Sequence, residues 1–485
     1  MIPQEMESNQ VPDRRPRRER RPEILAEKRR LKKALKQARK KAMAVDFDNV
    51  TVTGHGNMQF IEEFKLAIGF KELLAEKVSL EKGSNSVYSP ADLLDWLTDA
   101  LALGVSRFDH LDELKNDPGY LLTKGLERFP DESTFRNLFS DMTDHTFEEL
   151  EAILVALLNK RAKLEGPRSI WVDIDDTVIV LYGNQEKGEI GYNPNKRGRK
   201  SYLLRVATIH ETREVVAMEL LGGKASAHGI GDFFEKITKN LPSNYVLEGI
   251  RADSGFFSES NLTWIEDQEV DYHVKAKQYS TIKKVITHLN KMEKWEEIDD
   301  TYSVAECRFP LETWSFARRF VFIREEMPPK ESKQPQLDLE IPPEYKYQVI
   351  VTRSEEPAVE VWRNYNPRCD IENCIKELQY GFGSDEASQQ VFLKNACFAM
   401  CKAITYNLML WFKSALLTDE VKSYQAETLR RQIISIPGNI VNVGGGRKRV
   451  RLAPNPWLKK VVCTIERNLA LFFETLWKQT AMGPA

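Results

Sequence analysis

Carboxylates on predicted strands are the residues of this sequence best suited to chemistry. The densest group is the segment Trp171-Val-Asp173-Ile-Asp175-Asp176-Thr177-Val178. In a β-strand, Asp173 and Asp175 project to one face, whereas Asp176 points to the other face or begins the loop. Two carboxylates on an apolar strand are costly to desolvate unless a cation lies between them, and hard oxygen ligands favour Mg2+ or Mn2+. The segment therefore predicts a divalent metal site; the alternative is strand-end carboxylates that meet water or a lysine.

A second carboxylate ends another apolar segment, in the motif Arg251-Ala-Asp253-Ser-Gly255. An Asp at the carboxyl end of a strand lies where open α/β folds collect their ligands. Asp-Ser-Gly is also ordinary turn chemistry, so the motif by itself leaves both interpretations open.

The third acidic motif is Tyr365-Asn-Pro-Arg368-Cys-Asp-Ile-Glu372, which continues to Gln379 in a predicted helix. Arg368, Glu372 and Gln379 fall on one helical face, and the first two are neighbours at i, i+4. A surface ion pair would explain this spacing. The functional alternative is that Glu372 binds a metal while Arg368 holds a phosphate.

Hydrophobic periodicity predicts the elements that must position these residues. After Gly166-Pro167 we expect strands over 170–180, 202–209, 214–220, 246–253 and 270–277, with helices over 230–240 and 259–267. The first three strands are joined by loops and should form an antiparallel meander, whereas the last two each follow a helix and should pair in parallel. The expected fold class is therefore α/β, with a mixed sheet and helices on its faces.

Two further regions flank this predicted core. Residues 280–360 read as a β-rich insertion with strands over 302–308, 318–324 and 345–351, followed by helices over 366–380, 392–416 and 455–478, the first with Asn366 as its N-cap. Residues 57–165 read as all-helical, with Ser89 as an N-cap and Thr146 with Glu149 as a capping box. The segment 130–138 could open a DNA recognition helix, and a plain bundle helix fits equally well.

Charge is distributed very unevenly along the 485 residues, although the formal net charge is only -2. Residues 14–41 carry 15 Lys or Arg against three Glu, so the rest of the chain is acidic. We expect a basic helix over 23–41 with too little apolar surface to fold alone. It is either a solvated tail or an arm that binds nucleic-acid phosphates, with Arg29, Arg30, Lys32 and Lys33 as candidate contacts.

Other candidate DNA contacts lie in two basic loops and in the predicted insertion. Each loop either binds backbone phosphates or is simply solvated; the cations are Lys196, Arg197, Arg199 and Lys200 in the first, and Arg447, Lys448, Arg449 and Arg451 in the second. Trp295 and Trp314 could stack on an unpaired base, and packing is the alternative for both.

Neither a membrane span nor a disulfide framework is expected. No window approaches the ~18 to 20 uninterrupted apolar residues of a membrane helix. The six cysteines show no Cys-x2-Cys pair and no His at ligand spacing, which indicates reduced, mostly buried thiols in a cytoplasmic protein.

Taken together, the three acidic motifs resemble those of the DDE transposases of bacterial insertion sequences, in the branch with a Tyr-Arg-Glu-Lys (Y-x2-R-x3-E-x6-K) signature. The segments around Gly183-Asn-Gln-Glu186 and Gly191 to Arg199 are also similar to that branch. The signature lysine is replaced by Gln379, and Lys376 one turn earlier is a possible substitute.

The resemblance implies an RNase H-like catalytic core in which Asp175, Asp253 and Glu372 hold two Mg2+ ions, with Mn2+ as a substitute. Asp173 is the alternative to Asp175 as the first ligand. Such an enzyme cleaves the ends of its element and transfers the 3'-OH strand by two-metal-ion chemistry. Its implied partners are double-stranded DNA, as terminal inverted repeats and target, and a second copy in a synaptic homodimer; Tyr365, Arg368 and Lys376 would contact DNA, and the protein would be nucleoid-associated.

The expected organisation has six parts. They are a basic arm (1–44), a helical DNA-binding domain (45–165), the first part of the RNase H-like core (166–279), the β-rich insertion (280–360), the second part of the core with the Glu372 helix (361–423) and a C-terminal region (424–485).

Two rival functions remain at this point. Asp173-x-Asp175-x-Thr177 also resembles the opening motif of haloacid dehalogenase-like phosphatases, in which the first Asp is the nucleophile. That family builds a doubly wound parallel sheet, so an antiparallel meander over 170–220 would exclude it. The other rival is a catalytically retired, transposase-derived DNA-binding protein.

Overall fold

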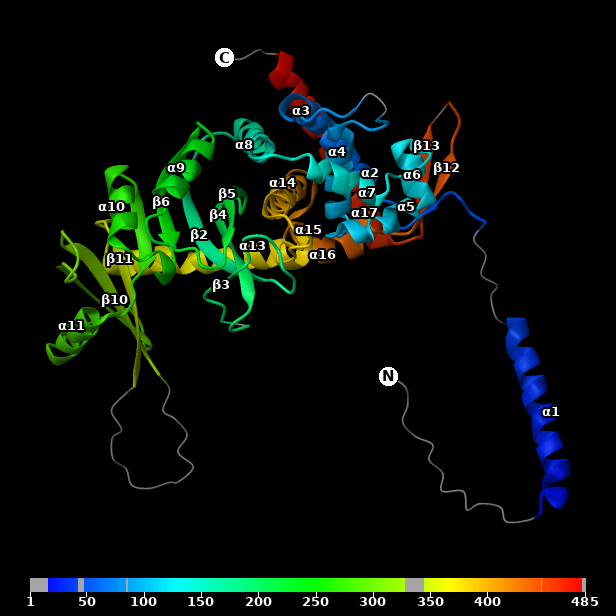
Figure 1. Cartoon of the computed structure of the whole chain (residues 1–485), viewed down its shortest axis with the longest axis horizontal. Coiled ribbons are helices and arrows are strands. Elements are labelled where there is room, and N and C mark those ends of the chain that lie inside the picture. Colours follow the sequence, from blue (N-terminus) through cyan, green and yellow to red (C-terminus); the bar gives the residue numbers. More distant parts are fainter. Residues whose placement is uncertain are drawn as a thin grey trace. The chain divides into compact units, whose positions relative to one another are not determined.

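We describe the chain from a computed structural model, which describes residues 16–41, 48–83, 86–194, 196–327, 344–445 and 447–481 (Figure 1). The chain divides into two compact units, Met1–Val50 and Thr51–Ala485. Residues 1–15 and 42–44 of the predicted arm lie outside the described residues, as does the middle of the predicted insertion, 328–343.

The first unit contains the helix α1 (Arg17–Lys41). Its Ala, Leu, Glu, Lys and Arg residues are strong helix formers, which explains a helix without a core. Leu31 and Leu35, its main apolar pair, are 60% and 54% exposed. The predicted basic helix over 23–41 is confirmed and begins six residues earlier, with Pro22 inside it.

In the described part of the second unit, the short strand β1 (Val52–Thr53) is followed by a helical region. Its helices are α2 (Gln59–Ala67), α3 (Phe70–Lys77), α4 (Pro90–Ala102), the 3-10 turn η1 (Phe108–His110), α5 (Asp112–Lys115), α6 (Pro118–Lys124), α7 (Glu132–Ser140) and α8 (Asp144–Glu165). Ser89 caps α4 as predicted and accepts a hydrogen bond from the backbone of Asp92. The capping box predicted at Thr146 and Glu149 is wrong. Thr143 is the N-cap of α8: its hydroxyl accepts the backbone N–H of Thr146, and the Thr146 hydroxyl accepts the backbone N–H of Thr143. Two threonines three residues apart can thus satisfy the backbone donors that a Thr–Glu capping box would satisfy.

The candidate recognition helix is α7, which buries Phe135, Leu138 and Phe139. Its start is acidic, and both acidic residues are engaged in ion pairs: Asp131 with Lys115 and Arg128, and Glu132 with Arg136. An acidic helix start disfavours a phosphate backbone. The structure therefore favours the packing interpretation of this segment.

A ten-stranded mixed sheet forms the centre of the second unit, in the order β3-β4-β2-β6-β7-β11-β10-β9-β8, with β5 paired to β4. The strands are β2 (Arg168–Val180), β3 (Glu189–Ile190), β4 (Lys200–Ile209), β5 (Val215–Gly222), β6 (Tyr245–Ala252), β7 (Asp271–Lys275), β8 (Glu296–Glu297), β9 (Tyr302–Phe309), β10 (Arg318–Glu326) and β11 (Tyr345–Thr352).

The predicted pairing of the first five strands is confirmed. β2, β4 and β5 form an antiparallel meander, and β6 pairs in parallel with both β2 and β7. The helices α9 (Gly231–Asn240) and α10 (Glu259–Asp267) precede β6 and β7. The meander excludes the doubly wound sheet of a haloacid dehalogenase-like phosphatase.

The three predicted insertion strands exist, but they continue the central sheet because β11 pairs antiparallel with β7. The same region contains a helix that was not predicted, α11 (Ser280–Lys291). Its buried residues Ile282, Ile286 and Leu289 recur at helical spacing, but the surrounding β-branched residues obscure this pattern.

A continuous helical run carries the third acidic motif. It comprises α12 (Ala358–Tyr365), the 3-10 turn η3 (Asn366–Cys369), α13 (Asp370–Lys376) and the π-helical turn η4 (Glu377–Gly381). The prediction that Asn366 caps a new helix is wrong: its φ of -57° and ψ of -40° are helical. Figure 1 shows this run, in yellow, extending along the sheet.

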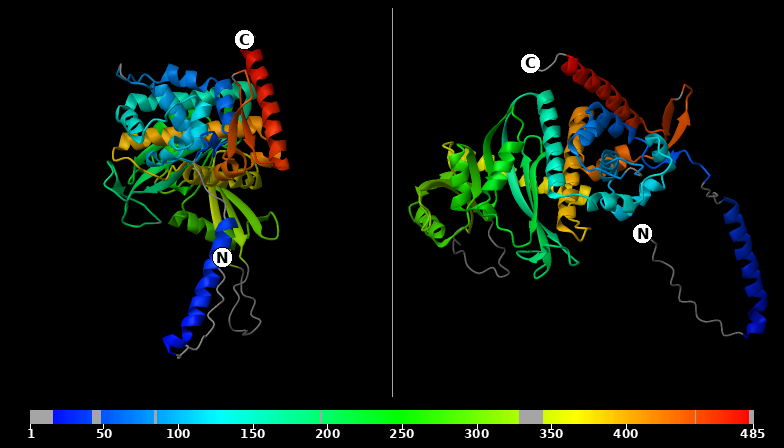
Figure 2. Two further views of the ribbon diagram at one scale, coloured as in Figure 1. Left: turned by 90° about the vertical axis from the view of Figure 1, so that its right-hand side faces the viewer. Right: turned by 45° about the horizontal axis from the view of Figure 1, so that its top comes forward.

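Segments from both ends of the second unit pack together. The buried helix α14 (Phe392–Leu416), predicted with the same bounds, contacts α4, α8 and β5, and α17 (Pro456–Ala481) contacts α2 (Figure 2). The short helices α15 (Asp419–Lys422) and α16 (Ala426–Leu429) and the turn η5 (Arg430–Ile434) lie between them in sequence. Among the described residues, no helix combines the length and the apolar character needed to cross a membrane.

A small second sheet corrects the expectation that the N-terminal region is all-helical. β1 (Val52–Thr53) pairs with β12 (Gly438–Asn442), which pairs with β13 (Lys448–Leu452). This pairing joins residues almost 400 positions apart, so local patterns could not predict it.

Candidate functional site

The register of the parallel pair β2–β6 determines which carboxylates meet. Asp173 is opposite Arg251 and Ile174 is opposite Ala252. The next residues along the two chains are Asp175 and Asp253, so these carboxylates lie side by side at the edge where β6 ends while β2 continues. Asp253 also caps the short turn that follows, because its Oδ1 accepts the backbone N–H of Gly255 at 2.7 Å.

Asp173 is engaged in a buried ion pair. Its side chain is 1% exposed and accepts hydrogen bonds from Nε and Nη2 of Arg251 at 2.6 and 3.0 Å. Nδ1 of His210 lies 3.2 Å from Oδ2. Arg251 also donates from Nη1 to the carbonyl of Asn364 at 2.6 Å. The pair therefore connects β2 and β6 to the helical run, and it leaves Asp173 poorly placed to bind a metal.

The negative charge of Asp175 is only partly neutralised. Nη1 of Arg368 lies 3.6 Å from its Oδ2, and the Asp175 side chain is 17% exposed. Burial raises the pKa of Asp175 to about 7; Arg368 opposes this shift, and the neighbouring charge of Asp253 adds to it. A carboxyl group with this pKa carries a proton about half the time at neutral pH.

Asp176 faces the opposite side of the strand, as the strand alternation predicts. Its two oxygens accept hydrogen bonds from Nε and Nη2 of Arg205 at 2.9 and 3.0 Å. The Arg205 guanidinium lies over the rings of Phe233 and Phe256. Of the three neighbouring carboxylates of β2, only Asp175 therefore has no guanidinium within hydrogen-bond distance.

A cavity of about 680 Å³ opens at this edge of the sheet and is lined by both Asp175 and Asp253. Gln379, which replaces the signature lysine, also lines it and donates from Nε2 to Oγ1 of Thr177 at 3.0 Å. The cavity wall further includes Asp176, Tyr192, Lys224, Ser226, His228 and Lys277.

The helical run places Arg368 and Tyr365 beside these carboxylates. Tyr365 is buried, and its hydroxyl donates to the carbonyl of Ala252 at 3.5 Å. Within the described ranges, Nη1 of Arg368 is buried and has no hydrogen-bond partner. The guanidinium therefore has an unused donor close to Asp175.

Glu372 is the predicted site residue least engaged in this arrangement. It is exposed on α13 and lies outside the cavity lining, and Lys376 is also exposed. Its helical spacing nevertheless puts it on the same face as Arg368 and Gln379, four residues after the first and seven before the second.

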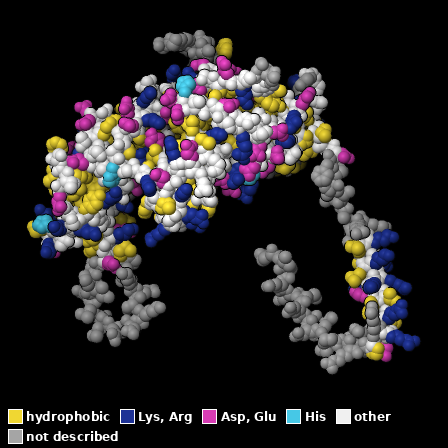
Figure 3. Space-filling view, in the orientation of Figure 1, with side chains coloured by type: hydrophobic (Ala, Val, Ile, Leu, Met, Phe, Trp, Pro, Cys, Tyr) yellow, Lys and Arg dark blue, Asp and Glu magenta, His cyan; other side chains and the backbone are white. Residues whose placement is uncertain are grey.

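Of the predicted DNA-contacting cations, Arg368 is buried, whereas those on α1 and in the two basic loops are exposed. They are Arg29, Arg30, Lys32 and Lys33 on α1, Lys196, Arg197, Arg199 and Lys200 before or at the start of β4, and Arg447, Lys448, Arg449 and Arg451 in the β12–β13 hairpin. Figure 3 shows Lys and Arg gathered along α1, whereas acidic and basic side chains alternate over the visible face of the second unit.

Both candidate stacking tryptophans are half-buried and packed. Trp295 donates from its indole to Asn290 at 3.0 Å, and the guanidinium of Arg324 lies over its ring. Trp314 packs against Phe257 and Phe320. Trp314 also lines a second cavity of about 580 Å³, which shares His228 with the first.

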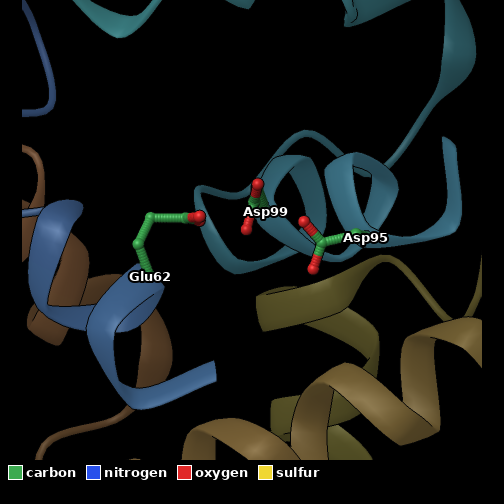
Figure 4. A group of neighbouring side chains, drawn as sticks. All are labelled: Glu62, Asp95 and Asp99. Carbon is green, nitrogen blue, oxygen red and sulfur yellow. The ribbon is translucent and has the colours of Figure 1, made fainter. Parts of the chain in front are cut away.

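A separate acidic cluster, absent from the sequence-based predictions, lies in the N-terminal helices. Figure 4 shows Glu62 from α2 approaching Asp95 and Asp99 of α4. The ammonium groups of Lys65 and Lys124 pair with these carboxylates, with Lys65 2.8 Å from Asp95. Two buried ammonium groups already supply the positive charge that a metal ion would bring, so the cluster is a buried ion-pair network.

Several residues that shape the site were missed by sequence reasoning. Arg205 and Arg251 fix Asp176 and Asp173, and the signal that could have found them was an arginine on each of two otherwise apolar strands. His228 and Lys277 carry no sequence motif. The six cysteines, all within the described ranges, are free thiols, and three of them are buried: Cys374, Cys397 and Cys401.

Comparisons with known proteins find transposases among the similar structures. The piggyBac transposase in a synaptic complex with hairpin DNA is similar in structure, with 12% identity, a TM-score of 0.40 and coverage of 78% of this chain and 79% of the other. The Mos1 transposase in a paired-end complex with the left transposon end has 13% identity, a TM-score of 0.15 and coverage of 40% and 61%. No curated protein matches the chain in sequence.

The decisive comparison is with a family model described as transposase DDE domain group 1, which matches residues 35–471. The match spans the candidate site, the whole central sheet and most of the C-terminal helix. The chain therefore belongs to this family of DDE transposases.

Proposed function

We propose that this protein is an active DNA transposase that cuts the ends of its element and transfers the freed 3'-OH strand in a cut-and-paste reaction. The observation that carries this proposal is the position of Asp175 and Asp253, which leave adjacent parallel strands into one cavity beside the unused donor of Arg368. Such a site suits phosphodiester chemistry because it combines carboxylate ligands with a fixed cation.

The carboxylates fit divalent metal ions. Burial raises the pKa of Asp175, the charge of Asp253 adds to this shift, and a hard cation would relieve the cost of ionising Asp175. Asp175, Asp253 and Glu372 would hold two Mg2+ ions, with Mn2+ as a substitute. When bound, these ions would activate a water or 3'-OH nucleophile and stabilise the leaving oxygen.

The chain's own groups would position the DNA. The free Nη1 of Arg368 would donate to a non-bridging phosphate oxygen, and Tyr365 would keep the start of η3 against β6. Glu372 would turn from its exposed position on α13 toward the cavity, which Gln379 of the same helical run lines and beside which Arg368 approaches Asp175. Lys376 would contact the strand backbone, in place of a signature lysine at 379.

Binding of the duplex would use the exposed cations outside the cavity. We assign phosphate contacts to α1, to the loop 196–200 and to the β12–β13 hairpin, with Trp295 and Trp314 as candidate stacking partners for an unpaired base. We further propose a synaptic homodimer on paired terminal repeats, an RNase H-like core, and membership of the bacterial insertion-sequence branch, with action at the nucleoid.

The experiment is cleavage of a duplex that carries the element's terminal inverted repeat, by purified full-length protein with Mg2+ or Mn2+. We expect strand cleavage that is lost in Asp253→Ala and Glu372→Ala, while both variants still bind the duplex. Lys283→Ala, which removes an exposed lysine of α11 outside the cavity, serves as the matched control.

The competing function is a DNA-binding protein that has lost strand cleavage. Gln379 in the lysine position and the exposed position of Glu372 favour it. Duplex binding without cleavage under any metal condition would support this alternative and refute the proposed enzyme. Cleavage that survives Asp253→Ala and Glu372→Ala would instead refute the assigned residues.

A further inference from the structure

The loop that follows β5, residues 223–230, is held in place by two buried polar side chains. Asn261 of α10 is 1% exposed; its Oδ1 accepts the backbone N–H groups of Gly229 and Ile230 at 2.9 and 3.1 Å, and its Nδ2 donates to Ala227 at 2.6 Å. Arg205 donates from Nη2 to the carbonyl of Ser226 at 2.9 Å. Four hydrogen bonds thus fix the middle and the end of this loop, so side chains on it are preorganised.

The loop brings His228 to a lysine from the other side of the cavity. Lys277 follows β7, two residues beyond the position that lies opposite Asp253. The backbone N–H of Tyr279 donates to the carbonyl of Lys277 at 2.8 Å and closes a tight turn. Nζ of Lys277 lies 3.5 Å from Nε2 of His228. Both side chains line the cavity that contains Asp175 and Asp253.

The cavity is therefore electrostatically divided. Asp175 and Asp176 lie within β2 and Asp253 directly follows β6, whereas Lys277, His228 and Lys224 contribute cationic or titratable nitrogen. Burial and the charge of Lys277 lower the pKa of His228, so at neutral pH the imidazole is neutral and can accept a hydrogen bond from the ammonium. Glu259 and Glu312 line the second cavity together with His228.

We propose that His228 and Lys277 form a binding subsite for a phosphate of the DNA strand, close to the phosphate that is cut. The Lys277 ammonium supplies positive charge. When a bound anion stabilises the protonated His228 imidazole, that imidazole becomes a second hydrogen-bond donor. This inference rests on the proposed function for the identity of the ligand, but the subsite can be tested without catalysis. Its role is to position the strand, with no part in bond making or breaking.

The first experiment measures the titration of the His228 imidazole by NMR in full-length, histidine-labelled protein, with chelator present. His228→Gln assigns the resonance among the seven histidines. We expect inorganic phosphate to raise the midpoint by about half a unit to one unit, in the parent and in Lys283→Ala but not in Lys277→Ala. A midpoint that ignores phosphate, or a rise that persists in Lys277→Ala, would overturn the subsite.

The second experiment uses DNA substrates in which one phosphate near the cut is replaced by an uncharged methylphosphonate. At one position, we expect cleavage by the parent to slow by about ten- to a hundredfold, the scale of one charge-assisted hydrogen bond. Lys277→Ala should be slowed to the same degree on unmodified DNA and no further by that replacement. If the loss of cleavage rate caused by Lys277→Ala and the loss caused by the methylphosphonate multiply at every position, the proposed subsite is wrong. If the parent cuts no substrate, the proposed function fails, and the phosphate titration alone decides the subsite.

Discussion

Replacing Asp175 by asparagine should stabilise the metal-free protein at pH 8 while it abolishes strand cleavage. The raised pKa of Asp175 means that the folded state resists ionisation of this group, which the unfolded chain permits freely. An amide of the same shape carries no charge to desolvate. The substitution therefore removes the cost of ionising a buried carboxyl group, a cost that proteins retain at functional sites.

The magnitude follows from the difference between the two pKa values. The pKa rises from 3.8 to about 7, a shift of roughly three units, which corresponds to about 4 kcal/mol as an upper bound. Because 17% of the side chain is exposed, we expect about 2 to 4 kcal/mol. Between pH 4 and pH 7 the folded state holds a proton that the unfolded state has released. The contribution of Asp175 to stability is thus complete below pH 4, is lost as pH rises to 7, and stays lost above.

Asp173 provides the matched control on the same strand. Its carboxylate is 1% exposed and accepts two hydrogen bonds from Arg251. Asp173→Asn should destabilise the protein by about 3 to 5 kcal/mol, because it leaves a buried guanidinium without its counter-charge. Two identical substitutions two residues apart should therefore have opposite signs at pH 8.

The assay is urea denaturation of the parent and both variants, in chelator, at pH 5 and pH 8. Asp175→Asn should raise the midpoint at pH 8 and have a much smaller effect at pH 5. Added Mg2+ should stabilise the parent but leave Asp175→Asn unchanged. Equal destabilisation by Asp175→Asn at both pH values would refute the reasoning, since Asp175 would then be a stabilising carboxylate like Asp173.

Further predictions concern the metal, the buried ion-pair network and the arm. Mg2+ affinity should rise about tenfold per pH unit below pH 7 and level off above, because binding expels the proton of Asp175; calorimetry in buffers of different ionisation enthalpy should detect that proton, and its absence at pH 6 would contradict the assignment. Lys65→Met should cost about 3 to 5 kcal/mol of stability, and recovery of the urea midpoint by Mg2+ would show that the cluster binds metal after all. Deleting residues 1–41 should weaken DNA binding and flatten its salt dependence without changing Mg2+ affinity; an unchanged salt slope would make the arm a solvated tail.

Local patterns predicted the strands well because each buried strand repeats an apolar or alternating signal over several residues. The meander and the two parallel pairings followed from loop length and from the helices at 230–240 and 259–267. The start of the α12–η4 run was missed because Asn366-Pro367 looks like a cap. A proline has helical φ, so the run continues through η3 where the chain packs against β6.

What could not be predicted depends on contacts between distant residues. The β1–β12 pairing and the packing of α17 on α2 join opposite ends of the second unit, and no local period records them. The Lys65–Asp99 contact spans 34 residues, and Lys277 meets His228 across 49. A charged residue in a sequence reveals its type but not its partner, so ion-pair networks remain hidden until the fold is known.

This limitation bears directly on the choice between Asp173 and Asp175. The sequence presents both as carboxylates on one face of a strand, and only the Asp175-x-Thr177 step, which resembles the family motif, favours Asp175. The difference between the two carboxylates comes from Arg251, which is 78 residues away from Asp173 in sequence. Its guanidinium pairs with Asp173 and also donates to the carbonyl of Asn364. Because Arg251 lies on β6, pairs with Asp173 of β2 and donates to the carbonyl of Asn364 in α12, it connects β6 to β2 and to the helical run that carries Glu372. Asp173 therefore has a guanidinium in direct hydrogen-bonding contact, whereas Arg368 approaches Asp175 only to 3.6 Å, and on this difference we propose Asp175 as the first metal ligand.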